Sequence, residues 1–276
     1  MKIALLILCH KNPDQIKKFI NLMKSDLFDI FIHVDKKSQM ELTYLESDSV
    51  HILPESKRVN VTWGGLSQID ATLNLIQNAN QYGNYDYYWL CSGQDMPVKS
   101  IEYMRKFFVD HSSNEFINLF QTLNNGGKQN NYDKRNDLYY PIWIQGLKLW
   151  QRILKRLYVE ITGGYNKTSI ARRKNYTGMK FFYGSQWWCL SGEAIRWILT
   201  YIENNDEYYR FFKNATTPDE CFFHTLIMNS PYAFKRKEYL HYIDWSNGGN
   251  SPKILDDKDL EKARKSKYLM ARKVEF

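Results

Sequence analysis

Short apolar runs alternate with amphipathic segments along the first hundred residues. Buried strands are predicted where apolar runs occur, at 3–9, 29–35, 49–54 and 87–91. Between them, apolar side chains recur at helical spacing over 13–25 and 64–81. Strands that alternate with helices in this way predict an α/β fold with a mostly parallel central sheet flanked by helices.

The same alternation resumes in the last third of the chain. Strands are predicted at 183–191 and 237–245, and helices at 192–204, 217–230 and 256–267. No internal repeat interrupts this order. Residues 1–276 are therefore expected to form one domain rather than two.

A basic and irregular stretch is inserted at about 121–182. Residues 121–137 are rich in Asn, Gly and Lys and lack periodicity, which predicts a surface loop. A basic helix is expected over 142–161, packing one apolar side on the domain. That side comprises Leu147, Trp150, Leu154 and Leu157. Residues 145–182 hold nine Lys or Arg and one acidic residue. The net charge of this segment therefore equals the net charge of +8 of the whole chain. An anionic membrane, nucleic acid or plain solvent could face this segment.

Several common chemistries are excluded by missing motifs. The chain has no phosphate-binding G-x-x-x-x-G-K-[ST] or G-x-G-x-x-G, no H-E-x-x-H and no G-x-S-x-G. The cysteines are far apart and indicate neither a disulfide framework nor a zinc site; they are Cys9, Cys91, Cys189 and Cys221. The one Asp-x-Asp triplet, Asp257 to Asp259, begins a charged helix, where acidic residues favour the helix dipole. No metal site is predicted.

Carboxylates follow two of the predicted strands. Asp35 and Asp95 each come just after an apolar run, at the sheet edge where open α/β sheets bind ligands. Glu220 lies in "TPDE", where Thr217 suits a helix N-cap and Glu220 falls at the third helical position. Spacing alone therefore gives Glu220 a capping role, whereas Asp35 and Asp95 are candidate ligand contacts.

Basic and aromatic side chains offer further contacts. Arg272 and Lys273 lie in an otherwise apolar end segment, where they could neutralise a diphosphate, and a basic tail is the alternative. Aromatic residues make up 16% of the chain, a content that suits stacking on sugars. Trp187 and Trp188 are neighbours in one predicted strand, so one must face each side of the sheet. One of the two is expected in the core, and the other could stack on a sugar.

Taken in order, the segments resemble the core-2/I-branching β-1,6-N-acetylglucosaminyltransferases and the related peptide O-xylosyltransferases. The matching motifs span nearly the whole chain and are "HVDKKS" at 33–38, "VTWGGLSQIDATL" at 61–73, "WLCSGQDMPVKS" at 89–100, "GSQWWCLS" at 184–191, "TPDECFFHTLIMNSP" at 217–231, "YIDWS" followed by "SPKIL", and "LMARK" at 269–273.

This resemblance implies a GT-A type fold with a Rossmann-like sheet and an inverting, metal-independent glycosyl transfer. Glu220 would then act as the base that deprotonates the acceptor hydroxyl. Lys273 would bind the diphosphate of a UDP-sugar. The nucleotide contacts of the family fall on Ile7 and Asp35, and Asp95 falls near the donor sugar.

The chain departs from the family at its second diphosphate-binding residue. An arginine is expected near His241 or Tyr242, and neither is an arginine. Arg272 and Lys253 are the candidates for that role. The acceptor contacts are predicted at Gln186, Trp187 and Trp188.

N-acetylglucosamine is the expected sugar, with xylose from UDP-xylose as the alternative. A carbohydrate-binding, transferase-like protein without turnover is a third possibility. The sequence is shorter than the animal enzymes, and no membrane anchor like theirs is expected. A bacterial-type cytoplasmic enzyme of surface polysaccharide synthesis with a lipid-linked acceptor is therefore expected. We expect the basic segment 148–180 to hold it against the anionic inner leaflet. Nucleic acid is not an expected partner, because no recognisable module for it occurs.

Overall fold

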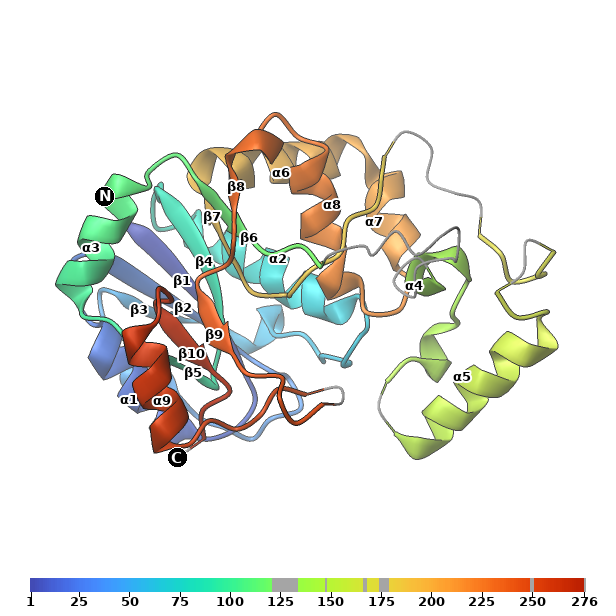
Figure 1. The fold of residues 1–276 in the computed structure, drawn as a ribbon, viewed down its shortest axis with the longest axis horizontal. Helices are drawn as coiled ribbons and strands as arrows, with labels where there is room; N and C mark the ends of the chain where they lie inside the picture. Colours follow the sequence, from blue (N-terminus) through green and yellow to red (C-terminus); the bar gives the residue numbers. More distant parts are fainter. Residues whose placement is uncertain (121–133, 147, 166–167, 174–178, 249–250, 276) are drawn as a thin grey trace.

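Seven strands form a mixed sheet at the centre of the protein (Figure 1). In order along the sheet they are β3 (Val50–Ile52), β2 (Phe28–Val34), β1 (Ile3–Cys9), β4 (Tyr87–Ser92), β7 (Trp188–Ser191), β6 (Glu115–Ile117) and β8 (Arg236–Lys237). The first four run parallel, β7 is antiparallel to both neighbours, and β8 is parallel to β6. The computed structural model describes residues 1–120, 134–146, 148–165, 168–173, 179–248 and 251–275.

Helices cover both faces of this sheet, which is why β1 is apolar throughout and β4 is buried along its whole length. On one face lie α1 (Pro13–Met23) and α3 (Ile101–Asp110); on the other lie α2 (Ser67–Ala79), α6 (Gly192–Asn204), α7 (Asp206–Phe212) and α8 (Phe222–Met228). Successive strand residues point to opposite faces. Leu5 accordingly packs in the core beneath α1 and α3, whereas Leu6 packs beneath α2, α6 and α8.

A second, three-stranded sheet brings the C-terminal segment beside the end of β4. Its order is β5 (Asp95–Pro97), β10 (Met270–Arg272) and β9 (His241–Ile243). In this sheet Arg272 lies in register with Asp95 on one side and Ile243 on the other. The pairing therefore joins two predicted site motifs that are 177 residues apart.

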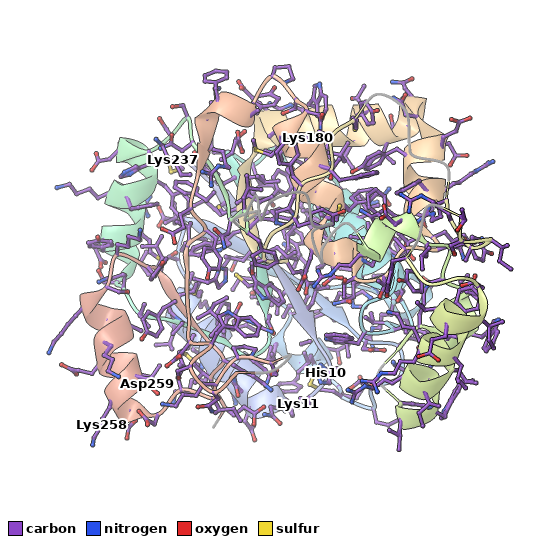
Figure 2. All side chains as sticks on the ribbon, turned by 45° about the vertical axis from the view of Figure 1, so that its right-hand side comes forward. His10, Lys11, Lys180, Lys237, Lys258 and Asp259 are labelled. Atoms are coloured by element: carbon purple, nitrogen blue, oxygen red, sulfur yellow. The ribbon has the colours of Figure 1, made fainter. Side chains whose placement is uncertain are left out.

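Helix α9 (Asp257–Lys265) packs on β10 through Leu260 and Ala263. Asp256 and Asp259 form a capping box at its first turn, and Asp259 also pairs with Lys253. Lys258 points outward from this helix in Figure 2. The prediction that the Asp-x-Asp triplet serves as a helix start is confirmed.

The predicted α/β class, with a mostly parallel sheet between helices, is confirmed. The strand at 3–9 and the helix at 192–204 have the predicted bounds. Helix α3, strand β6 and helix α7 were not predicted, because their short apolar patterns lie between charged residues. Among the described helices, none has both the length and the apolar character needed to traverse a bilayer.

The inserted segment differs from its prediction. Its helix, α5, begins only at Leu149 and ends at Ile161, and it stands apart from the central sheet in Figure 1. Trp150 is 49% exposed and Leu157 is 45% exposed, so the predicted packing of this side on the domain is wrong for both. Leu154 packs partly on a small cluster, and Leu147 and residues 121–133 lie outside the described residues. That cluster, made by Leu138, Tyr140, Ile144 and Ala171, is too small to cover the helix.

Candidate functional site

A cavity of about 520 Å³ opens where β1, β2 and β4 end. This is the sheet edge at which open α/β folds bind ligands, and the volume is within the range of about 300–1,000 Å³ usual for small-molecule sites. Its lining includes five of the predicted site residues, namely Asp35, Gln186, Trp187, Arg272 and Lys273. The tertiary structure therefore brings together segments from both ends of the chain.

Arg272 is held in place from two sides. Its Nη1 lies 2.9 Å from Asp95 Oδ1, and its guanidinium lies 4.1 Å from the centre of the Trp187 ring. Asp95 is fully buried and also accepts a hydrogen bond of 2.7 Å from the Ser92 backbone N–H. Because a guanidinium is planar, a carboxylate at its edge and a ring at its face fix its orientation.

Asp95, which was predicted near the donor sugar, is not itself among the lining residues and lies behind Arg272. Burial by itself would raise the pKa of Asp95, but Arg272, His241 and the Ser92 N–H together lower it below its usual value. The carboxylate therefore stays ionised and supports Arg272 from behind.

Cys91, Asp95 and His241 are a possible metal-binding group, since their donor atoms lie within 4.8 Å of one another. Their chemistry does not fit that role. Both Asp95 oxygens are engaged, one by Arg272 and one by Ser92 N–H, and the second also lies 3.2 Å from His241 Nε2. Burial, together with the charge of Asp95, raises the pKa of the Cys91 thiol well above its usual value. These three side chains instead form a polar support behind Arg272.

Positive charge dominates the wall of the cavity. Lys11, Lys37, Arg272 and Lys273 line it, and Asp35 is the one carboxylate among its described lining residues. Lys11 and Lys273 share Glu275, whose Oε1 lies 2.6 Å and 3.7 Å from their ammonium groups. Such a wall suits an anionic ligand more than a divalent cation, which prefers several oxygen ligands.

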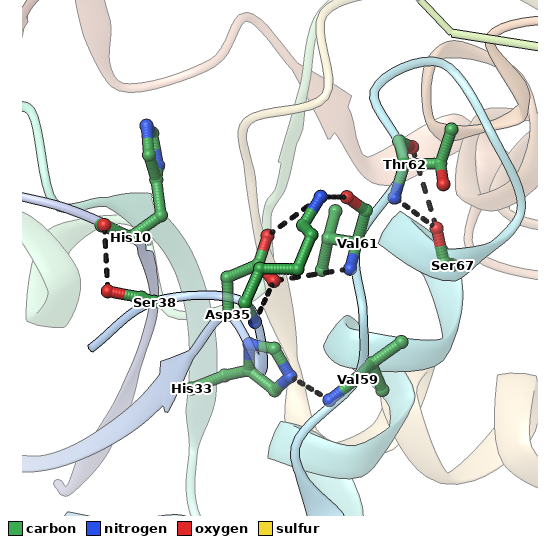
Figure 3. Close-up of polar contacts among 9 residues, drawn as sticks. His10, His33, Asp35, Ser38, Val59, Val61, Thr62 and Ser67 are labelled. Atoms are coloured by element: carbon green, nitrogen blue, oxygen red, sulfur yellow. Dashed lines mark hydrogen bonds and ion pairs between the residues drawn. The ribbon is translucent and has the colours of Figure 1, made fainter. Parts of the chain in front are cut away.

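Asp35 organises the loop that follows β2 (Figure 3). Its Oδ1 accepts a hydrogen bond of 2.9 Å from the Lys37 backbone N–H, and its Oδ2 lies 3.7 Å from Lys37 Nζ. Nearby, His33 Nε2 accepts a hydrogen bond of 2.8 Å from Val59 N–H, and burial lowers the pKa of His33 to about 4. Burial and then Lys11 lower the pKa of His10, so both imidazoles are neutral at pH 7.

Three predicted contacts lie elsewhere. The Ile7 side chain is fully buried in the core, and the lining of the cavity begins with the next residue, Leu8. Trp188 is also fully buried and packs on Phe223, so of these two neighbouring tryptophans it is Trp187 that faces the cavity. Lys253 lies 2.5 Å from Asp259 and is not among the lining residues, whereas Arg272 is.

Glu220 does not complete a capping box, so that prediction was wrong. Residues Pro218–Glu220 form a 3₁₀ turn, and α8 begins only at Phe222. Thr217 has a left-handed backbone with φ 49°, and its hydroxyl donates to the Thr216 carbonyl oxygen at 2.8 Å instead of capping the turn. The Glu220 carboxylate pairs with the guanidinium of Arg135 on α4 (Lys134–Asp137). Arg135 had no recognisable signal in the sequence.

The Glu220 turn is not among the lining residues of the cavity, but its backbone bonds to segments that are. Thr217 N–H donates to the Gly64 carbonyl oxygen, and Gly184 N–H donates to the Glu220 carbonyl oxygen, both at 2.9 Å. Gly64 follows Trp63, and Gly184 precedes Gln186 by two residues; Trp63 and Gln186 both line the cavity. The turn that holds the candidate base is thus hydrogen-bonded to two segments that contribute lining residues.

Comparison with known proteins finds a family model that matches most of the chain. Residues 3–264 match the family model described as "Core-2/I-Branching enzyme". Xylosyltransferase oxt of Drosophila melanogaster is 23% identical over 289 residues, which cover 95% of this chain and 30% of that protein. Xylosyltransferase 2 of Canis lupus familiaris is 22% identical, with 94% and 30% covered. The chain therefore spans about 30% of the length of these curated relatives.

One solved structure is similar over most of the chain, at low sequence identity. Core-mannan synthase A from Aspergillus fumigatus, in a Mn/GDP form, has a TM-score of 0.44 and 14% sequence identity. The similarity covers 96% of this chain and 82% of that one.

Proposed function

Because the chain belongs to the Core-2/I-branching enzyme family, we propose that it is a GT-A type glycosyltransferase that moves a sugar from a UDP-sugar to a hydroxyl group of a glycan. N-acetylglucosamine is the proposed sugar. Xylose is the alternative, favoured by the xylosyltransferases among the relatives. We place the reaction in surface polysaccharide synthesis on a lipid-linked acceptor, at the cytoplasmic face of a membrane.

One observation carries the proposal: Arg272, clamped between Asp95 and Trp187, faces the cavity beside Lys273. Two fixed cations there can neutralise the diphosphate of the donor as it leaves. This charge replaces a divalent metal in the proposed mechanism. The lining offers Asp35 as its one described carboxylate, which is a poor donor set for a hard cation.

Glu220 is proposed as the base of a single in-line displacement. The acceptor oxygen forms a bond to the anomeric carbon and loses its proton to Glu220, while the bond from that carbon to the diphosphate oxygen breaks. UDP leaves from the opposite face with the bonding electrons, and Arg272 and Lys273 stabilise its charge. Arg135 engages Glu220 Oε2, and no described residue donates a hydrogen bond to Oε1. Oε1 is therefore the oxygen available to take the proton.

Release of UDP from Glu220→Gln and from the wild type tests this proposal. The variant should fold normally and lose about two to four decades of rate, the usual scale for a general base. Glu203→Gln, an exposed change on α6, is the matched control and should keep the wild-type rate. Equal rates for Glu220→Gln and the wild type would remove Glu220 from the mechanism, and no UDP release by the wild type would favour a binding protein without turnover.

The donor is tested separately by thermal shift with UDP-N-acetylglucosamine, UDP-xylose and UDP-galactose. A ligand that binds only the folded protein raises the unfolding temperature according to its affinity. UDP-N-acetylglucosamine should give the largest shift. A larger shift with UDP-xylose would select the alternative donor.

Helix α5 supports the proposed membrane contact of the basic segment 148–180. Apolar side chains along one side of α5 are exposed, among them Leu149 at 71%, Trp150 at 49% and Ile161 at 80%. Lys148 is exposed at the start of the same helix. Aromatic and aliphatic side chains beside basic ones are typical of helices that lie in an anionic membrane surface.

Co-sedimentation with anionic phosphatidylglycerol vesicles tests this contact at low and high salt. We expect binding that high salt weakens, because the charge attraction is screened. Trp150→Ser should reduce binding, whereas Phe234→Ser, which removes an 82% exposed ring outside α5, should not. Absence of binding at both salt concentrations would contradict the proposal.

A further inference from the structure

A second cavity, of about 370 Å³, lies between α5 and Trp63. Trp63, which is 47% exposed, also lines the 520 Å³ cavity, so the two cavities share this residue. Three basic side chains of α5 line the second cavity, Arg152, Lys155 and Arg156. We propose that this cavity, which we call the α5 cavity, binds an oxyanion carried by the acceptor, either a phosphate or a carboxylate group.

The three basic residues share one face of the helix. Arg152, Lys155 and Arg156 are spaced i, i+3 and i+4, which places their side chains next to one another. The exposed apolar side chains Trp150 and Leu157 lie on a different face. Trp150, which is proposed to contact a membrane, is therefore not part of the α5 cavity.

Charge in the α5 cavity is unbalanced. No ion pair joins Arg152, Lys155 or Arg156 to a carboxylate in the part of the chain that the structure describes. Glu160, which is exposed, is the one acidic residue among the described lining residues. Arginine forks hold phosphate and carboxylate groups through paired, charge-assisted hydrogen bonds. Such a group would supply the missing negative charge.

Lys155 is the innermost of these cations. Its Nζ donates a hydrogen bond of 2.6 Å to Thr216 Oγ1 and lies 4.7 Å from the centre of the Tyr140 ring. Burial, and then the nearby charge of Arg135, lower the pKa of Lys155 to about 8. A partly buried ammonium group without a carboxylate partner is destabilising unless an anion joins it.

The contacts of Lys155 lead directly to the candidate base. Thr216 N–H donates to the Arg135 carbonyl oxygen at 3.1 Å, and the Arg135 side chain pairs with Glu220. An oxyanion held at Lys155 would therefore place the neighbouring part of the same molecule near Glu220. This is why we assign the oxyanion to the acceptor, an assignment that rests on the proposed transferase function.

Calorimetric titration of the full chain tests the α5 cavity. UDP at saturation first fills the donor cavity, and the probes are then inorganic phosphate and glucuronate at constant ionic strength. Arg152→Gln combined with Arg156→Gln should weaken the binding of the preferred probe by about tenfold or more. The preferred probe identifies the group as phosphate or carboxylate.

A matched control removes two positive charges from α9, on the far side of the molecule from α5 (Figure 1), by Lys258→Gln with Arg264→Gln. This control and the α5 variant should both bind UDP like the wild type. Equal probe affinity in the α5 variant and the wild type, or no binding of either probe to the wild type, would overturn the inference. Failure of the wild type to bind UDP would instead contradict the proposed function, and the probe titration without UDP would still decide the α5 cavity.

Discussion

Arg135 and Glu220 form an ion pair although 85 residues separate them in the chain. The pair joins the inserted segment to the turn that precedes α8, and its two side chains are 26% and 28% exposed. It therefore links the position of the candidate base to a helix outside the central sheet.

Arg135→Met removes the group that orients the Glu220 carboxylate. We expect kcat to fall about ten- to hundredfold, because small displacements of a catalytic group are costly, while KM for the UDP-sugar stays the same. Arg135→Lys should restore part of the rate. Steady-state UDP release at varied donor concentration measures both constants, and a raised donor KM with unchanged kcat would contradict this role.

Arg272→Lys keeps the positive charge but loses the planar group that lies between Asp95 and Trp187. UDP should bind about tenfold more weakly, the scale of one lost charge-assisted hydrogen bond. Calorimetry with UDP measures the change. Arg105→Lys on α3, which alters an exposed ion pair with Asp26, is the matched control and should bind UDP normally. Unchanged affinity in Arg272→Lys would show that the guanidinium does not contact the diphosphate.

Gly184→Ala should disturb both stability and activity. An added Cβ would lie 1.8 Å from the Asn118 carbonyl oxygen, and Gly184 N–H holds the Glu220 carbonyl oxygen. We expect the free energy of unfolding to fall by about 1–3 kcal/mol, as for other overpacked sites. Urea denaturation measures this loss, and UDP release well below the unfolding temperature should also be slower.

Substitutions at two other glycines distinguish a loss of stability from a loss of activity. Gly192→Ala would bring a Cβ within 2.2 Å of the Tyr85 carbonyl oxygen at the opposite end of β4, so it should destabilise the protein without slowing the folded enzyme. Gly83 has no atom within 4 Å of an added Cβ, and Gly83→Ala should change little. A normal rate in folded Gly184→Ala would show that this hydrogen bond does not position Glu220.

Asp219 makes stability depend on pH. Burial, and then the charge of Glu220, raise the pKa of Asp219 above the value of about 3.9 usual for an unfolded chain. Between these two pKa values the folded protein binds more protons at this group than the unfolded chain does. The contribution of Asp219 to stability is therefore greatest at low pH and is lost as the pH rises from about 4 toward its folded pKa.

Asp219→Asn should consequently raise the free energy of unfolding relative to the wild type by an amount that grows from pH 4 toward neutral pH. Urea denaturation at several pH values measures this difference. In a Glu220→Gln background the difference should be smaller, because one cause of the raised pKa is gone. A difference that stays constant with pH would contradict the assignment.

Local patterns in the amino-acid sequence were sufficient to predict the central strands and helices. The apolar run at 3–9 and the amphipathic helix at 192–204 have the predicted bounds, because their periodicity reports which side chains are buried. The same reasoning identified Asp259 as part of a helix start. It failed for Thr217, whose left-handed backbone is set by its hydrogen bond to Gly64 rather than by its neighbours in sequence.

The amino-acid sequence by itself determined the α/β alternation, the family motifs and the residue types available for chemistry. Only the tertiary structure decided that Asp95 supports Arg272 from behind, that Trp187 and not Trp188 faces the cavity, and that Arg135 reaches Glu220. Periodicity is local and reports burial within one element. The orientation of a side chain in a site depends on contacts between segments far apart in the chain, and these exist only once the sheets have formed.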